Sequence, residues 1–194
     1  MRIGVLGGTF DPVHVAHLVA AAEARHALGL DRVLLVVANQ PWQKADRHDL
    51  TSAEDRFAMV AAAVEHVEGL EPSRLEIDRG GPSYTADTLE QLHVEHPGAE
   101  LYLIVGLDVV RALATWSRAE GLPDLAELVV VNRPGETWTD PPPGWTVHRV
   151  EIPGLEISAS DLRRRVAEHR PIDFLVPPGA VRVIRERGLY AGGG

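Results

Sequence analysis

Residues 2–17 read RIGVLGGTFDPVHVAH, and this stretch carries the strongest indication of the fold class. It begins with a short apolar run that ends in Gly7 and Gly8, which is typical of a buried strand closed by a glycine turn. The helical stretch that follows runs from about 14 to 28 and stops at Gly29. A strand, a glycine turn and a helix in this order predict the first unit of a parallel α/β sheet.

The rest of the chain repeats this alternation. Apolar runs without polar alternation are separated by helical segments, as expected for a parallel sheet covered on both faces. We expect an α/β fold: a Rossmann-like, doubly wound parallel sheet with helices on both faces and a small C-terminal helical part, in one domain over 1–194. The expected strands are 2–7, 32–38, 74–78, 100–106, 127–132 and 146–152. The first expected helix is 14–28. The second is opened by the capping-box spacing Thr51–Glu54 and runs to about Val67, and the third runs from after Ser83 to about His96. A short helix is expected after 106, and the last two helices start near Ser158 and near Pro177 or Pro178.

Composition excludes several classes of protein. The chain has 194 residues and no cysteine, which excludes disulfide frameworks, cysteine-ligated metal sites and thiol nucleophiles. Its net charge of −9 argues against a nucleic-acid partner or an anionic membrane surface. No apolar run approaches the ~20 residues of a membrane span. We expect a soluble, cytoplasmic protein that binds no membrane, and we leave homo-oligomerisation open.

The first loop has the features of a phosphate site. Consecutive glycines let backbone N–H groups approach a phosphate, and the next helix directs its positive end there. His14 and His17 lie three residues apart on one face of its first turn, where imidazoles can stabilise charge during phosphoryl transfer. The spacing fits neither a Walker P-loop nor GxGxxG. Asp11 with the two histidines also has plausible spacing for a metal site.

Residues 7–17, GGTFDPVHVAH, resemble the GGTFDPxHxGH signature of bacterial nicotinate-nucleotide adenylyltransferases, which belong to the nucleotidylyltransferase superfamily with an HxGH motif. Ala16 stands where that family usually has glycine, so we expect a shift in nucleotide affinity rather than loss of activity. Other matches follow in order: 40–44 with the PxxK loop, 80–89 with GG-PSYT-DTL, 106–108 with GxD, Trp116, 133–135 with RPG, and 157–163 with ISSTxIR.

The resemblance implies transfer of AMP from ATP to nicotinate mononucleotide, with Mg²⁺ bridging phosphates rather than held by protein side chains. It assigns catalysis to His14, His17, Lys44 and Arg163. It assigns ATP binding to Gly7, Gly8, Thr9, Phe10, His14, His17, Gly106, Asp108, Ser158, Ser160 and Arg163, and the mononucleotide to Lys44, Tyr84, Thr85, Trp116 and Ser117.

One physical argument favours the acid form of the mononucleotide. Tyr84 and Thr85 lie near the start of a predicted helix, whose free N–H groups suit a carboxylate. A nicotinamide amide would also need an acceptor.

Other interpretations of the same residues stay open. Taken alone, Lys44 is typical of a solvated surface side chain, and Trp116 is typical of a core residue. Ser83, Thr85 or Ser158 could each be an ordinary helix cap. The competing functions are a nicotinamide-mononucleotide, phosphopantetheine or other superfamily adenylyltransferase, a metal-dependent phosphoesterase that uses Asp11, His14 and His17, and a non-catalytic nucleotide-binding module.

Overall fold

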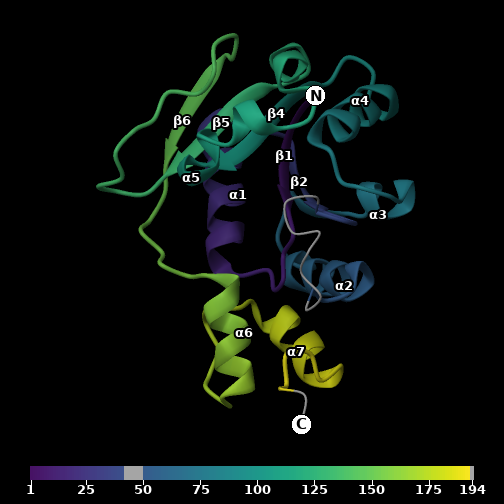
Figure 1. Ribbon diagram of the computed structural model, residues 1–194, viewed down its shortest axis with the longest axis vertical. Coiled ribbons are helices and arrows are strands. Elements are labelled where there is room, and N and C mark those ends of the chain that lie inside the picture. The colour runs from purple at the N-terminus through teal and green to yellow at the C-terminus, as the bar shows by residue number, and fades with distance from the viewer. Residues whose placement is uncertain (42–49, 193–194) are drawn as a thin grey trace.

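Six parallel strands form the centre of the computed structural model, which describes residues 1–41 and 50–192 (Figure 1). Their order is β3-β2-β1-β4-β5-β6, so the chain reverses its winding direction between β1 and β4. Ligands in such sheets bind beyond the carboxyl ends of the strands at this switch point. The strands are β1 (Arg2–Gly8), β2 (Arg32–Val37), β3 (Leu70–Ser73), β4 (Glu100–Gly106), β5 (Glu127–Asn132) and β6 (Val147–Glu151).

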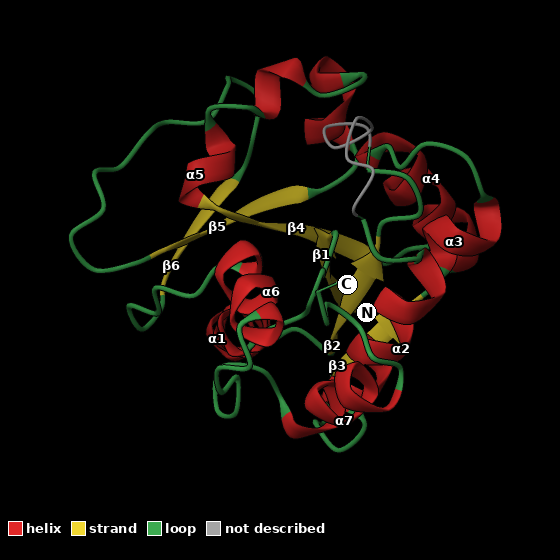
Figure 2. Ribbon diagram, turned by 60° about the horizontal axis from the view of Figure 1, so that its bottom comes forward, coloured by secondary structure: helices red, strands yellow, loops and turns green. Residues whose placement is uncertain are grey.

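Helices cover both faces of this sheet, which is seen nearly edge-on between them in Figure 2. The helices α1 (Val15–Leu28), α2 (Ala53–Val64), α6 (Ala159–Ala167) and α7 (Pro178–Glu186) lie on one side. The other side carries α3 (Leu75–Arg79), α4 (Thr85–Glu95), α5 (Leu107–Val110) and the 3-10 turns η2 (Leu113–Thr115) and η3 (Ala119–Asp124). The doubly wound fold expected from the sequence is confirmed.

The inner strands contain uninterrupted apolar runs because both faces of the sheet are buried. In β2, Val33, Leu35 and Val37 pack into the core on one side of the sheet, while Leu34 and Val36 pack into the core on the other. All five are at most 6% exposed. Successive strand residues point to opposite faces, so two cores require an uninterrupted apolar run.

The predicted strand at 74–78 is wrong, because these residues form α3. The edge strand lies just before it and pairs with β2 from Val33↔Leu70 to Val36↔Ser73. After Ser73 the chain turns into a single helical turn, in which Asp78 N–H donates to the Arg74 carbonyl at 2.9 Å and the two side chains form an ion pair at 2.8 Å. The Leu-Glu-Ile alternation imitates a strand but belongs to this turn.

The helix expected from Thr51 begins one residue later and ends earlier than predicted. Ser52 is the N-cap of α2, and its hydroxyl accepts a hydrogen bond from Asp55 N–H at 3.1 Å. The pKa of Asp55 is lowered by its hydrogen bond with the Ser52 hydroxyl and by Arg187. The capping motif is therefore Ser52 with Asp55, shifted by one position from the predicted spacing.

The C-terminal helical part is confirmed as well. Helix α6 begins after its N-cap Ser158, and α6 and α7 lie together at the end of the molecule that holds the C-terminus (Figure 1). Helix α7 packs closely on α2, since a Cβ at Gly179 would collide with the Ala62 carbonyl. Within the described residues, no helix is long and apolar enough to cross a membrane.

Candidate active site

Two adjoining hollows open at the carboxyl ends of the central strands. One, which we call the histidine hollow, is lined by His14, His17, Gly106, Asp108 and Arg133 among others. The second, which we call the glutamate hollow, is lined by Gly8, Thr9, Glu76, Ser83, Thr85 and Thr88 among others. Gly7, Ile104, Val105 and Trp116 line both, so the two spaces meet at the switch point of the sheet.

His14 is the N-cap residue of α1 and is only 7% exposed. This burial lowers its pKa to about 4, so the imidazole is uncharged at neutral pH. Its ring stacks on that of His17 with centroids 3.6 Å apart and 22° between the planes. Ala16, in the same turn, lines the same hollow.

The ring of His17 is oriented from two sides. Its Nδ1 accepts the backbone N–H of His14 at 3.2 Å, so the proton of the neutral ring sits on Nε2. The edge of Phe10 meets it at a centroid distance of 5.0 Å and an angle of 81°. Phe10, predicted to contact ATP, is 3% exposed, so its side chain acts as a support for His17.

Arg163 reaches back from α6 to the first loop. Its Nη1 donates to the Asp11 carbonyl at 2.7 Å and lies 3.8 Å from Asp11 Oδ2. The Tyr190 hydroxyl donates to the other carboxylate oxygen, Oδ1, at 2.7 Å. Burial and the neighbouring Asp11 raise the pKa of Tyr190, so its proton stays in this bond. The C-terminal part therefore holds the loop that carries the histidines.

Other residues predicted for the site lie at its margin. Ser158 Oγ accepts Asp161 N–H at 3.2 Å as the cap of α6, and Ser160 is exposed beside it. Tyr84 is the N-cap of α4, and Ser117 is exposed. These four residues and Arg163 line neither hollow. Lys44 lies outside the described residues.

Arg56 is a buried residue that the sequence analysis missed. It is 1% exposed, and its guanidinium donates to the carbonyls of Thr9 at 2.9 Å, Ala38 at 2.6 Å, Asn39 at 3.1 Å and Thr51 at 2.9 Å. Burial lowers its pKa from the usual value. One side chain thus joins the loops after β1 and β2 to the start of α2. The available signal was its place on the apolar face of that helix, with buried Met59 and Val60 one turn later.

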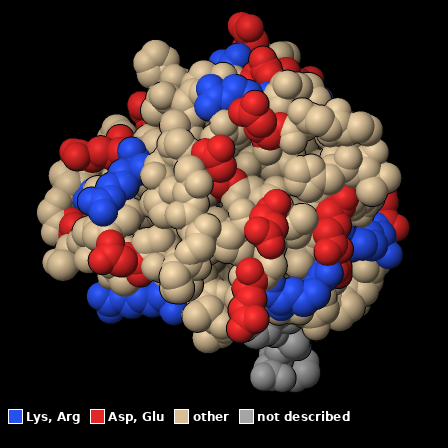
Figure 3. Space-filling view, turned by 90° about the horizontal axis from the view of Figure 1, so that it is seen from above, with Lys and Arg blue, Asp and Glu red and all other residues tan. Residues whose placement is uncertain are grey.

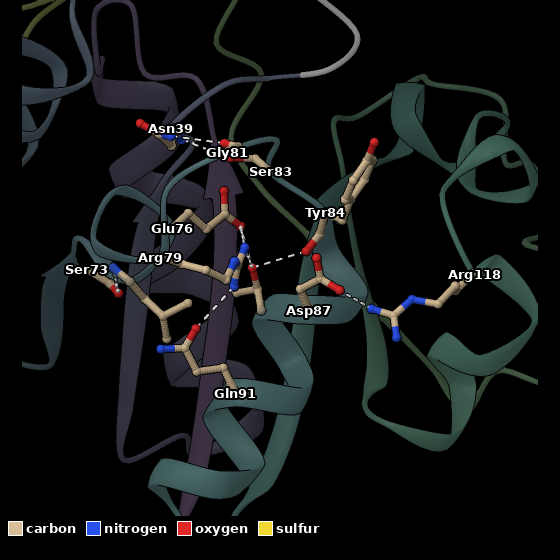
Figure 4. A network of polar contacts seen from close by, with 12 residues as sticks. Asn39, Ser73, Glu76, Arg79, Gly81, Ser83, Tyr84, Asp87, Gln91 and Arg118 are labelled. Carbon is tan, nitrogen blue, oxygen red and sulfur yellow. Dashed lines mark hydrogen bonds and ion pairs between the residues drawn. The ribbon is translucent and has the colours of Figure 1, made fainter.

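A second polar group behind the glutamate hollow was also missed. Glu76 is 7% exposed and accepts the Thr88 hydroxyl proton at 2.5 Å (Figure 4). Nearby, Ser83 Oγ accepts Asn39 N–H at 2.8 Å, and Asn39 Nδ2 donates to the Gly81 carbonyl at 2.9 Å. Ser83 therefore ties the loop after β2 to the turn before α4 and is not a helix cap.

The geometry does not favour the metal site considered for Asp11, His14 and His17. Asp11 is engaged by Tyr190 and Arg163. Across the parts of the chain that the structure describes, no three His, Asp or Glu side chains are grouped so as to hold a metal ion.

The molecular surface gives no sign of a cationic expanse on the face seen in Figure 3. Acidic and basic side chains alternate there, in keeping with the net charge of −9. That face therefore offers no basic tract for a polyanion.

Comparison with known proteins shows the family of this chain. The model of the cytidylyltransferase-like family matches residues 5–165. A probable nicotinate-nucleotide adenylyltransferase of Corynebacterium kroppenstedtii is 46% identical over 97% of this chain and 90% of its own length. One of Streptomyces coelicolor is 46% identical over 96% of this chain and 100% of its own. This chain belongs to the nicotinate-nucleotide adenylyltransferase family. It is an enzyme of the nucleotidyltransferase class.

Solved structures support the fold assignment. The nicotinic acid mononucleotide adenylyltransferase of Plasmodium falciparum, solved in complex with NaAD, superimposes with a TM-score of 0.79 at 21% identity. The match covers 97% of each chain. A putative nicotinate-nucleotide adenylyltransferase of Vibrio parahaemolyticus gives 0.72 at 20% identity, over 99% of this chain and 96% of that one. These two proteins and this chain therefore share the Rossmann-like fold described above.

Replacing Arg56 tests the link between the two loops. We expect Arg56→Met to lower the free energy of unfolding by about 3 kcal/mol, because buried carbonyl oxygens lose their donor. Urea unfolding measures this change. The control, Arg182→Met, removes an exposed arginine whose ion pair with Glu65 spans 3.9 Å, and should change stability by less than ~0.5 kcal/mol. Equal effects of the two substitutions would contradict the structural role of Arg56.

Proposed function

We propose that this enzyme transfers the adenylyl group of ATP to nicotinate mononucleotide, forming deamido-NAD and pyrophosphate. The observation that carries the proposal is the meeting of the two hollows beside Gly7 and Trp116. Two ligands that share this boundary can bring a phosphate of one against a phosphate of the other. Holding both reactants in line is a large part of what catalysis of phosphoryl transfer requires.

The histidine hollow suits the triphosphate-bearing substrate. Gly7 has no atoms within 4 Å of where its Cβ would be, so a ligand can approach the backbone there. His14 and His17 line the hollow at the start of α1, which adds the positive end of a 14-residue helix. Asp108 and Gly106 line the same space, where the carboxylate can accept hydrogen bonds from ribose hydroxyls.

The glutamate hollow suits the mononucleotide. Thr85 lines it at the first turn of α4, an 11-residue helix whose free N–H groups favour a carboxylate such as that of nicotinate. The Trp116 ring lines the wall and can stack on a pyridine ring. Tyr84, Ser117 and Lys44 remain predicted contacts of this substrate.

The reaction needs no covalent enzyme intermediate. The phosphate of nicotinate mononucleotide is already an ionised nucleophile, so its oxygen attacks the α-phosphorus of ATP and pyrophosphate leaves. The enzyme must offset the charge that gathers between two anions. His17, with its proton on Nε2, donates a hydrogen bond, and neutral His14 adds a second imidazole without charge repulsion between the stacked rings. Arg163 and Lys44 are the proposed cations, and neither histidine acts as a general base.

Mg²⁺ fits this proposal as a partner of the phosphates. It keeps several waters and binds one or two carboxylates beside substrate phosphates. Asp108 is exposed at the histidine hollow and would hold an ion-bound water. When bound, Mg²⁺ neutralises part of the phosphate charge. The cytoplasmic location and any homo-oligomer remain predictions.

A pyrophosphate-release assay tests the reaction directly. We expect release when ATP is supplied with nicotinate mononucleotide, and much slower release with nicotinamide mononucleotide or with no acceptor. Release without any acceptor would instead support a phosphoesterase. No release with any mononucleotide would support a non-catalytic nucleotide-binding module.

Substituting His17 tests the proposed donor. We expect His17→Ala to lower kcat by roughly 10²–10³, the usual loss for one transition-state donor. His26→Ala, an exposed histidine near the end of the same helix, is the matched control and should keep the wild-type rate. The melting temperatures of both variants are measured alongside the rates. A folded His17→Ala enzyme with unchanged turnover would remove His17 from the reaction.

Substituting Trp116 tests the mononucleotide site. We expect Trp116→Ala to raise the KM for nicotinate mononucleotide mainly and the KM for ATP less, because the ring is proposed to stack on pyridine. Trp116→Phe should retain part of the affinity. An equal rise of both KM values would contradict the assignment of this side chain to the mononucleotide alone.

A further inference from the structure

The wall of the glutamate hollow contains an acidic side chain, Glu76. A carboxylate substrate can bind there only if the negative charge of this side chain is balanced. Glu76 lines this space together with Thr85, Thr88 and Trp116, and it is 7% exposed. We propose that Arg79 and Thr88 balance the charge of Glu76, and that this balance determines the preference for the acid over the amide form of the mononucleotide. The inference rests on the proposed function and goes beyond it by naming specificity-determining residues.

Glu76, Thr88 and Arg79 form a short chain of hydrogen bonds at the wall of the hollow. Figure 4 shows the Glu76 and Arg79 side chains close to each other. Arg79 Nη2 donates to Thr88 Oγ1 at 3.1 Å, and the Thr88 hydroxyl donates to Glu76 Oε1 at 2.5 Å. The same guanidinium nitrogen lies 4.0 Å from Glu76 Oε1. Thr88 is 2% exposed, so its single hydroxyl proton is committed within the protein.

Arg79 is itself held in position. Its Nη1 donates to Gln91 Oε1 at 3.2 Å, and its side chain is 23% exposed against 9% for that of Glu76. The cation therefore sits on the outer side of the pair and the carboxylate on the side of the hollow. Because α3 carries both residues three positions apart, the pair is built into one helical turn.

An unbalanced carboxylate here would act differently on the two mononucleotides. Two like charges several ångströms apart in a partly dehydrated site repel strongly enough to change affinity about tenfold or more. The carboxylate of the acid substrate would feel this repulsion, whereas a neutral amide would not and can donate a hydrogen bond to Glu76. With Arg79 in place, the local charge is close to zero, and the helix start at Thr85 can favour the acid.

Removing the cation and removing the carboxylate should have different effects on the preference for the acid substrate. Arg79→Met leaves Glu76 unbalanced and should lower the ratio of kcat/KM for nicotinate mononucleotide to kcat/KM for nicotinamide mononucleotide by about tenfold. Glu76→Gln keeps an acceptor for Thr88 but leaves a free cation, so the ratio should stay at the wild-type value or rise. Arg79→Lys should retain most of the preference, and the double variant Arg79→Met/Glu76→Gln should recover it.

The experiment measures both substrates, with ATP saturating, on the same preparation of each variant, so that the ratio does not depend on the folded fraction. The control is Arg182→Met, which removes an exposed arginine of α7 that pairs with Glu65 and does not line the glutamate hollow. Its ratio should equal that of the wild type. The KM for ATP should be unchanged in all variants.

The outcomes separate this inference from the proposed function. A wild-type enzyme that adenylates neither mononucleotide contradicts the proposed function and this inference with it. If the wild type prefers the acid but Arg79→Met lowers kcat/KM equally for both substrates, the chain of hydrogen bonds only supports α4 and the inference is overturned. A fall of the ratio in Glu76→Gln as large as in Arg79→Met would overturn it as well.

Discussion

The site depends on one buried guanidinium that satisfies four backbone carbonyls from three segments of the chain. Arg56 donates to carbonyls after β1, after β2 and before α2, and it is almost fully buried. An unpaired buried carbonyl is costly, so each of these loops is stable in its observed path only while the arginine is there. The loop with the histidines and the loop that leads toward Lys44 are thereby held against each other. Positioning of this kind is what a reaction between two bound anions requires.

A second constraint comes from the far end of the chain. Asp11 is buried in the first loop, and its carboxylate is bonded by Tyr190 and paired with Arg163. The C-terminal helices are therefore part of the site's framework as well as a cover for the sheet. This arrangement also gives Arg163 a structural role. Its Nη1 donates to the Asp11 carbonyl, so the residue positions the loop in addition to its proposed role as a cation.

Much of the fold could be predicted from the sequence because local patterns carry it. The apolar runs of β1, β2, β4 and β5 and the stop at Gly29, whose φ is 58°, are properties of neighbouring residues. The prediction for 74–78 was wrong because it relied on a local alternation that resembles a strand. In the structure, residues 70–73 already form the edge strand beside β2, and the following residues form a helical turn with an ion pair between Arg74 and Asp78. The histidines, Gly106, Asp108, Thr85 and Trp116 were found by motif and do line the two hollows. Arg56 and Glu76 were not found, since their roles depend on partners that are distant in the chain, such as Thr9, 47 residues from Arg56, and Thr88, 12 residues from Glu76.

Short stretches of sequence were enough to predict most of the strands and helices, with the segment 74–78 as the exception, together with the family and the residue types at the strand ends. Each of these features depends on the spacing of residues that are close in the chain. Three-dimensional packing was needed to show which of those residues line the same hollow, that the Phe10 ring contacts the His17 ring, and that Arg163 binds the Asp11 carbonyl. It also decided that an acidic side chain, Glu76, stands in the wall of a space proposed for an acidic substrate. The physical reason is that burial and hydrogen-bond pairing are properties of neighbours in space, and the chain brings those neighbours together only when the sheet is complete.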